Sequence, residues 1–328
     1  MENKRQFIVT LVRHGETMSN RFKIMQGQLD TQLSDMGEEQ ARLAGKRLKD
    51  QRFTHVFSSD LARAANTARK ILAENTNTTC NLTLDQRLRE RGFGHLEGRP
   101  FTDYKKAQEE SGVSHEMFTP EGGETIDQVY HRAKDFFRDL CKLMAEPVKP
   151  HSVSDEKDAS PSDGEFPPSP SGSESQLTQQ KKTHSHGGAL TDTSNLIDLS
   201  PKTCPTASTS GSSSGIHIAP SSSVASSASA SESKADIDHV LIVSHGLLLR
   251  ELKRVILEKF KGVLEGPMAQ EALAVSPNTG VTSVTMSVNY KYNKIKSQCI
   301  ECHCFNCAAH LRGSNTNLIS QALFKGAL

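Results

Sequence analysis

The sequence has no long hydrophobic run and no clear excess of either charge. A membrane-spanning helix needs roughly 18 or more consecutive apolar residues, and no such stretch occurs in the 328 residues. We therefore expect no transmembrane segment. Lysine and arginine together number 39, and aspartate and glutamate 38. This balance argues against a nucleic-acid partner, because proteins that coat nucleic acids carry a basic excess, but it allows a locally basic pocket.

The first residues also lack the apolar stretch of a signal peptide. Residues 1–5 are polar or charged apart from Met1, so we expect no secretory leader. The sequons at Asn77 and Asn81 are then expected to stay unmodified. The seven cysteines are expected to be reduced thiols, because disulfide frameworks belong to oxidising compartments.

One short stretch organises the rest of the chain. Residues 7–12 form an apolar run that predicts a buried strand, and Arg13, His14 and Gly15 follow it directly. Ligands of open α/β sheets bind at this end of the strands. There the guanidinium of Arg13 can hold two phosphate oxygens, and a neutral His14 can attack phosphorus. The motif predicts phosphate chemistry, although a tripeptide alone could occur by chance.

A second strand delivers another histidine in the same way. Residues 239–243 form a run rich in β-branched and aliphatic residues, and Ser244, His245 and Gly246 follow it. In one parallel sheet the carboxyl ends of the strands meet at the same edge. We therefore expect His14 and His245 to lie close together.

Strands and helices alternate along the chain, which implies a mostly parallel sheet with helices on both faces. The hydrophobic patterns predict strands at residues 7–12, 55–59, 82–84, 239–243 and 281–290, the last as an edge strand. They predict helices at residues 40–48, 60–72, 104–110, 126–144 and 247–260.

Residues 147–234 differ from the rest in composition. Serine, proline, glycine and threonine dominate this segment, which leaves too little apolar surface to offset the entropy of ordering. We expect a disordered insertion there. Residues 1–146 and 235–328 would together form one domain.

Three further side chains complete the candidate site. Asn20 could donate a hydrogen bond, and Arg63 could neutralise phosphate oxygens together with Arg13 and His245. Glu90 could protonate the leaving alkoxide and later activate water, although its two arginine neighbours favour the ionised carboxylate unless burial opposes them. Simpler interpretations exist: a solvated arginine for Arg63, a solvated charge run for Glu90 and its neighbours, and a core histidine for His245. The arginines would take the place of a metal.

The order of these motifs resembles that of the histidine phosphatase superfamily, also called phosphoglycerate mutase-like. The resemblance implies a three-layer αβα sandwich with a mostly parallel central sheet, and no cofactor. It implies His14 as nucleophile, Glu90 as proton donor, and Arg13, Arg63 and His245 as the phosphate pocket. It rests on residues 11–17 with Asn20, 58–64, 89–91 with Gly94 and 97–98, 122–125 and 243–246.

Within the superfamily the sequence is most similar to fructose-2,6-bisphosphatases. This resemblance implies a cytosolic phosphatase of small phosphorylated metabolites that lowers glycolytic flux, with nucleus and mitochondrion as further locations. Fructose 2,6-bisphosphate and 2,3-bisphosphoglycerate are the implied substrates. The similar segments are residues 53–61, 87–91, 118–125, 127–129 and 275–280.

Two other functions stay open. A mutase would form the same phosphohistidine but return the phosphoryl group to the substrate instead of passing it to water. A non-catalytic scaffold would act through the insertion, whose protein partners the sequence leaves unknown.

A dense cysteine run near the C-terminus has a spacing that could hold zinc. It lacks the two separated ligand pairs of common zinc modules, so we expect no metal there. The run consists of Cys299, Cys302, Cys304 and Cys307, with His303 inside it.

Overall fold

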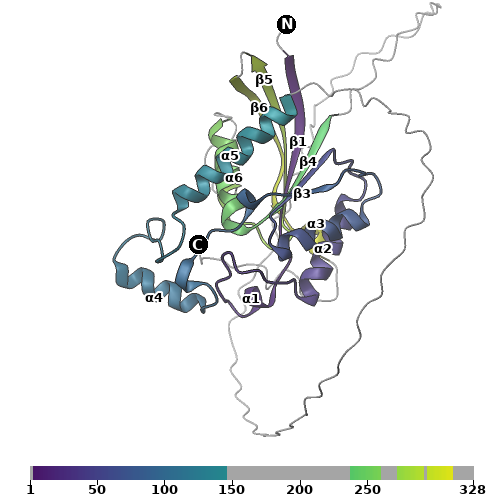
Figure 1. Cartoon of the computed structure of the whole chain (residues 1–328). Helices are drawn as coiled ribbons and strands as arrows, with labels where there is room; N and C mark the ends of the chain where they lie inside the picture. Colours follow the sequence, from purple (N-terminus) through teal and green to yellow (C-terminus); the bar gives the residue numbers. More distant parts are fainter. Residues whose placement is uncertain (1–2, 146–236, 260–271, 292–293, 313–328) are drawn as a thin grey trace, which may run out of the picture. The chain divides into compact units, whose positions relative to one another are not determined.

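The computed structural model describes residues 3–145, 237–259, 272–291 and 294–312 (Figure 1). The predicted insertion, residues 147–234, lies outside the described residues. None of the helices in the described ranges combines the length and the apolar character that crossing a lipid bilayer requires.

A six-stranded sheet forms the centre of the described structure, with strand order β3-β2-β4-β1-β5-β6. The strands β3, β2, β4 and β1 pair in parallel, and β5 pairs antiparallel with both β1 and β6. The predicted mostly parallel sheet is therefore confirmed. The strands are β1 Asn3–Arg13, β2 His55–Ser58, β3 Leu82–Leu84, β4 Asp238–Ser244, β5 Val281–Lys291 and β6 Lys294–Cys307.

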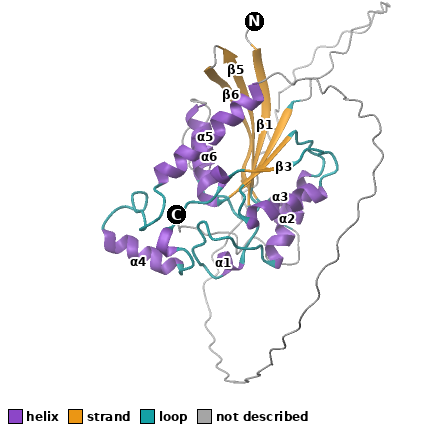
Figure 2. Ribbon diagram, viewed as in Figure 1, coloured by secondary structure: helices purple, strands orange, loops and turns teal. Residues whose placement is uncertain are grey.

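Helices cover both faces of this sheet, which confirms the three-layer arrangement (Figure 2). In β4, Val240 and Ile242 pack into the core beneath α5 and α6, whereas Leu241 and Val243 pack beneath α2 and α3. Successive side chains of a strand point to opposite faces, so this alternation separates the two layers. The helices are α1 Met18–Arg21, α2 Asp35–Leu48, α3 Ala62–Glu74, α4 Phe101–Ser111, α5 Ile126–Ala145 and α6 Gly246–Lys259, and the short 3₁₀ helices are η1 Gln86–Leu88, η2 Gly94–Leu96 and η3 Ala309–Leu311.

The predicted edge strand at residues 281–290 is wrong in its position. It forms β5, which lies between β1 and β6, so β6 is the edge. Alternation of polar and apolar residues reports which face of a strand is buried and carries no information about its neighbours along the sheet.

Strand β6 also contains the cysteine run. Cys302 packs against the core on the α5 and α6 side, and Cys304 packs against the core on the α2 and α3 side. These two thiols therefore lie on opposite faces of the sheet. Within the described ranges, no group of three or more histidine, cysteine, aspartate or glutamate side chains is placed to hold a metal ion.

A buried histidine in β4 links the stability of the fold to pH. The ring of His239 is 6 % exposed, and its Nε2 lies 2.8 Å from Oγ1 of Thr10. Burial lowers the pKa of His239 from 6.5 to about 4. Between these values the unfolded chain binds the proton and the folded chain does not.

We therefore expect the free energy of unfolding to fall as the pH decreases from about 6.5 to about 4. His239 alone should account for up to about 3 kcal/mol, at about 1.4 kcal/mol for each pH unit of the shift. His239→Gln should flatten this acid slope in denaturant titrations, whereas His131→Gln, on the exposed side of α5, should not. Equal slopes in the two variants would contradict this assignment.

Candidate active site

Two neighbouring strands deliver the two histidines to one edge of the sheet. Arg13 at the end of β1 is paired with Ser244 at the end of β4, and the amide of His14 donates to the carbonyl of Ser244 at 2.9 Å. The register therefore sets the next residues, His14 and His245, beside each other. Their ring centroids are 5.1 Å apart.

The imidazole of His14 is held with one nitrogen available. Its Nδ1 lies 2.7 Å from the carbonyl oxygen of Gly15. Since a carbonyl can only accept, Nδ1 carries the hydrogen and Nε2 carries the lone pair. Burial, followed by the charges of Arg63 and Arg13, lowers the pKa of His14 well below its usual value. The ring is neutral near pH 7, which makes Nε2 a competent nucleophile.

Gly15 allows the backbone after His14 to approach helix α2 closely. A Cβ atom at Gly15 would lie 2.4 Å from the carbonyl oxygen of Gly37, a distance that no side chain tolerates. The Gly15 amide also donates to Oγ1 of Thr67 at 3.0 Å. The glycine that the motif contains is thus required by packing as well as by access to a ligand.

The loop that precedes β5 holds Arg13 and His14 in place through hydrogen bonds. Nη1 of Arg13 donates to the carbonyl of Ser276 at 2.7 Å. Nδ2 of Asn278 donates to the carbonyl of His14 at 2.9 Å, and the Thr279 amide donates to the carbonyl of Arg13 at 3.0 Å. Sequence reasoning treated this loop only as a turn and as part of a resemblance, so its contact with the site was missed.

Arg63 lies in the first turn of α3 and points into the protein. It is 1 % exposed, so the alternative of a solvated arginine is wrong. Its Nη1 and Nη2 donate to the carbonyls of Leu29 and Gly27, each at 2.7 Å. Burial lowers the pKa of Arg63 to about 10, which still leaves the group charged at neutral pH.

Glu90 is held at the N-terminus of α6. Its carboxylate accepts the amide hydrogens of Arg91 at 2.9 Å, Leu247 at 3.2 Å and Leu248 at 3.3 Å. A carboxylate at this place is stabilised by the free amides and dipole of the helix. The carboxylate also lies close to Arg13, because a Cβ atom at Gly246 would lie 3.6 Å from both Oε2 of Glu90 and Cζ of Arg13.

The two arginines that flank Glu90 point to other partners. The guanidinium of Arg89 binds the carboxylate of Asp60. Arg91 is fully buried and donates to the carbonyls of Glu124 at 2.7 Å and Phe118 at 2.8 Å. Neither guanidinium therefore hydrogen-bonds to the Glu90 carboxylate, although the charge of Glu90 does act on Arg91 and raises its pKa against the effect of burial. The solvated charge run is wrong for Arg91.

Arg132 of α5 is a positioning residue that sequence reasoning missed. Its guanidinium donates to the carbonyls of Arg89 at 2.5 Å and Glu90 at 2.9 Å, and it forms an ion pair with Glu124. It thereby holds the backbone that carries Glu90. No sequence signal distinguishes Arg132 from the other charged residues on the polar side of this amphipathic helix.

Asn20 lies in α1, and its side chain serves the start of that helix. Oδ1 of Asn20 accepts from the amide of Thr17 at 3.1 Å, and Oγ1 of Thr17 accepts from the amide of Asn20 in return. This is a capping box. The hydrogen bonds described for Asn20 therefore involve Thr17, and they leave its Nδ2 group to donate elsewhere.

Unpartnered polar atoms gather around His14. Both ring nitrogens of His245, Nε of Arg13 and Nε of Arg63 are buried without a hydrogen-bond partner. Such groups are rare in proteins, because nearly every buried polar group is paired. Burial and the charge of Arg63 lower the pKa of His245 well below its usual value, so His245 is neutral. Two buried guanidinium groups with free donors fit an oxyanion and disfavour a cation.

Comparison with known proteins points in the same direction. The model of the histidine phosphatase superfamily (branch 1) matches residues 9–147. Fructose-2,6-bisphosphatase TIGAR of Bos taurus is 36 % identical over 314 residues, which cover 94 % of this chain and 98 % of the relative. The probable phosphoglycerate mutase GpmB of Erwinia tasmaniensis is 38 % identical over 151 residues, which cover 44 % of this chain and 68 % of the relative.

Solved structures show the same fold. The structure of the mycobacterial glucosyl-3-phosphoglycerate phosphatase matches with a TM-score of 0.54 at 20 % identity. The match covers 92 % of this chain and all of the other. The phosphoglycerate mutase-like sandwich expected from the motifs is therefore confirmed.

We expect the unpartnered donors to bind one inorganic phosphate ion. Arg63→Met should weaken that binding by about tenfold or more, because a buried hydrogen bond to a charged group contributes about 1.5–3 kcal/mol. Titration calorimetry measures the effect. Arg69→Met is the matched control, since Arg69 is an exposed arginine of the same helix. Equal weakening by both variants would show that Arg63 does not face the anion.

Proposed function

The chain belongs to branch 1 of the histidine phosphatase superfamily, and we propose that it hydrolyses the 2-phosphate of fructose 2,6-bisphosphate through a phosphohistidine on His14. One observation carries the chemistry: a neutral, buried His14 has its Nε2 available beside unpartnered donors of Arg13, Arg63 and His245. The substrate is inferred from relatives named fructose-2,6-bisphosphatase that match nearly the whole chain. Related esters such as 2,3-bisphosphoglycerate belong to the same proposal.

In the first step, Nε2 of His14 attacks phosphorus and the bond to the sugar oxygen breaks. The guanidinium groups of Arg13 and Arg63 and the ring of His245 stabilise the charge that spreads over the outer phosphate oxygens. Asn20 adds a hydrogen bond through its Nδ2 group. The arginines supply the positive charge for which other phosphatases use a metal ion.

Glu90 is the proposed proton donor for the leaving alkoxide. The Arg91, Leu247 and Leu248 amides fix its carboxyl group beside Arg13.

In the second step, water attacks the phosphohistidine and the P–N bond breaks. The carboxylate of Glu90 now accepts a proton from that water, and orthophosphate leaves with the oxygen of the water bonded to phosphorus. The same side chain therefore serves as acid and then as base, which regenerates both His14 and the protonated carboxyl group.

A mutase is the second candidate, because the probable phosphoglycerate mutase GpmB is 38 % identical to this chain over 151 residues. It would share the first step and then return the phosphoryl group to the substrate. Orthophosphate release from 2,3-bisphosphoglycerate identifies a phosphatase, whereas interconversion of monophosphoglycerates without release identifies a mutase.

We also infer where this activity would act. Removal of fructose 2,6-bisphosphate would lower glycolytic flux in the cytoplasm, with the nucleus and the mitochondrion as further locations implied by the resemblance. The insertion would recruit protein partners and leave the chemistry unchanged.

The decisive experiment is phosphate release from fructose 2,6-bisphosphate by wild type and by His14→Ala. Loss of the nucleophile should reduce kcat by about four orders of magnitude or more. With radioactive phosphate at position 2, rapid denaturation at alkaline pH, where the P–N bond of phosphohistidine is stable, should trap label on the wild type and none on the variant. His131→Ala, an exposed histidine, should behave as wild type. Label on His14→Ala would refute the proposed nucleophile.

Replacing residues 147–234 with a short Gly-Ser linker should leave kcat/KM for fructose 2,6-bisphosphate unchanged. The described strands and site residues all lie outside this segment, so its replacement removes none of them. A folded deletion variant without phosphatase activity would contradict the proposed domain division. Intact activity with a lost cellular effect would support a partner-binding role for the segment.

A further inference from the structure

Lys253 of α6 is a buried cation that takes no part in the chemistry proposed above. It is 2 % exposed. Its Nζ donates to the carbonyl of Ala274 at 2.8 Å and to Oδ1 of Asn306 at 2.9 Å, and it lies 3.5 Å from Oγ of Ser276. All three partners are neutral oxygens, so the ammonium group is held without a carboxylate among its hydrogen bonds.

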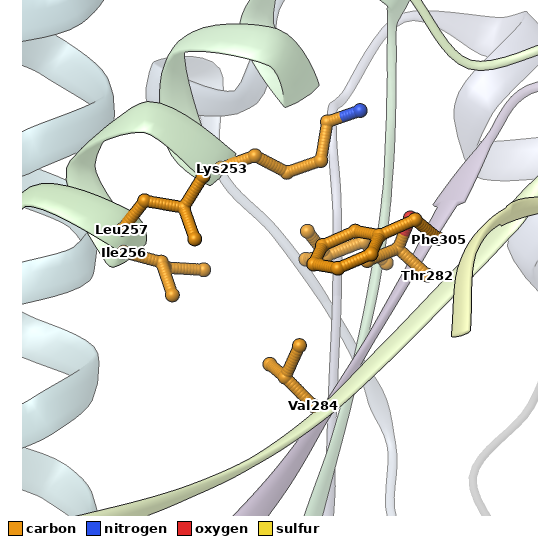
Figure 3. A pocket seen from close by; sticks show the side chains of 7 residues that line it. Lys253, Ile256, Leu257, Thr282, Val284 and Phe305 are labelled. Carbon is orange, nitrogen blue, oxygen red and sulfur yellow. The ribbon is translucent and has the colours of Figure 1, made fainter. Parts of the chain in front are cut away.

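The remaining surroundings of Lys253 are mostly apolar. Figure 3 shows its side chain extending from α6 in a small cavity whose wall includes Val284, Phe305 and Thr282. The cavity measures about 10 Å³, which is at the lower limit for one water molecule. A buried charge needs strong compensation, and here the protein oxygens provide it.

Two of these oxygens, from Ala274 and Ser276, belong to the loop before β5 that contacts Arg13 and His14, and the third, from Asn306, belongs to β6. Ser276 donates through Oγ to Oδ1 of Asn306 at 2.6 Å, and its carbonyl accepts Nη1 of Arg13 at 2.7 Å. Asn306 adopts a left-handed backbone with φ of 46°, a conformation that asparagine tolerates better than most residues. The network therefore runs from Lys253 through Ser276 to the guanidinium of Arg13.

We propose that Lys253 is a positioning residue of the phosphate pocket, whose ammonium group holds the loop of Ser276 and thereby fixes Arg13, and whose charge makes anion affinity depend on pH. The inference rests on the proposed function, because it assumes that Arg13 binds phosphate. It assigns to the site a residue that touches neither substrate nor His14.

The direction of the effect follows from the charge. Burial, with a smaller effect of the nearby Arg250, lowers the pKa of Lys253 to about 7. The side chains that line its cavity from β1, β5 and β6, which are Leu11, Thr282, Val284 and Phe305, do not titrate. Below this pH the ammonium donates three hydrogens and adds positive charge, and above it one donor and the charge are lost. Anion affinity should decrease as the pH rises through about 7.

Sulfate is a suitable probe, because its charge stays constant in this range. Titration calorimetry of the full chain should show a sulfate affinity that falls between about pH 6 and pH 8. The neutral rings of His14 and His245 titrate at lower pH, so they do not account for this step. A lysine with only a structural role would not produce this pH-dependent step in sulfate affinity.

Lys253→Met keeps the unbranched shape of the side chain, one atom shorter, and removes its charge and donors. This variant should lose the pH step and bind sulfate about three- to tenfold more weakly near pH 6, the effect expected for one hydrogen bond. Lys259 is an exposed lysine of the same helix. Lys259→Met should keep the pH-dependent step and the sulfate affinity of the wild type. A pH step that survives in a folded Lys253→Met protein would overturn the proposal.

Asn306→Asp provides a second test that keeps Lys253. A carboxylate at this position raises the pKa of the lysine, so the step should move to higher pH by about one unit or more. An unmoved step would overturn the proposal even if Lys253→Met does not fold. A wild type that hydrolyses fructose 2,6-bisphosphate but shows no step would refute Lys253 alone, whereas a wild type that neither hydrolyses it nor binds sulfate would refute the proposed function as well.

Discussion

The parallel pairing of β1 with β4 is the constraint on which the site depends. Two segments more than two hundred residues apart become neighbours because their apolar runs pair in one register, with Arg13 opposite Ser244. A histidine and a glycine follow the last residue of each strand. Because the two strands are parallel, these residues lie at the same edge of the sheet. A slip of this register would separate the two rings and leave each histidine as an ordinary buried side chain.

Burial sets the electrostatics of this edge. It lowers the pKa of both histidines, so they stay neutral, whereas guanidinium groups remain charged even at the reduced pKa of Arg63. A neutral imidazole therefore lies among permanent cations, an arrangement that suits attack on a phosphate dianion. The backbone carbonyls of Leu29, Gly27 and Ser276 hold the arginines. Because carbonyls orient a guanidinium without cancelling its charge, the cations stay available to a ligand.

Sequence patterns were sufficient for the fold class, the strands β1 and β4, and the helix α5, since periodicity and a histidine after each strand are local signals. They were insufficient for β6, whose polar, cysteine-rich stretch has no regular alternation, and for the place of β5 inside the sheet. The nucleophile motif was visible because its residues are contiguous. Arg132 and Ser276 were not, because their contribution is a side chain or a carbonyl that meets the site only after folding.

Helix α6 connects the two halves of the proposed chemistry. The amides of its first turn hold the carboxylate of Glu90, and two turns later Lys253 holds the loop of Ser276 that fixes Arg13. A shift of this helix would therefore move Glu90, the proposed proton donor, and Arg13, the proposed phosphate ligand, together. The buried side chains of α6 pack against the sheet on one face. The core therefore fixes the helix, and the helix in turn fixes Glu90 and the loop of Ser276. The position of Glu90 relative to Arg13 therefore depends on the placement of one helix and not on two independent loops.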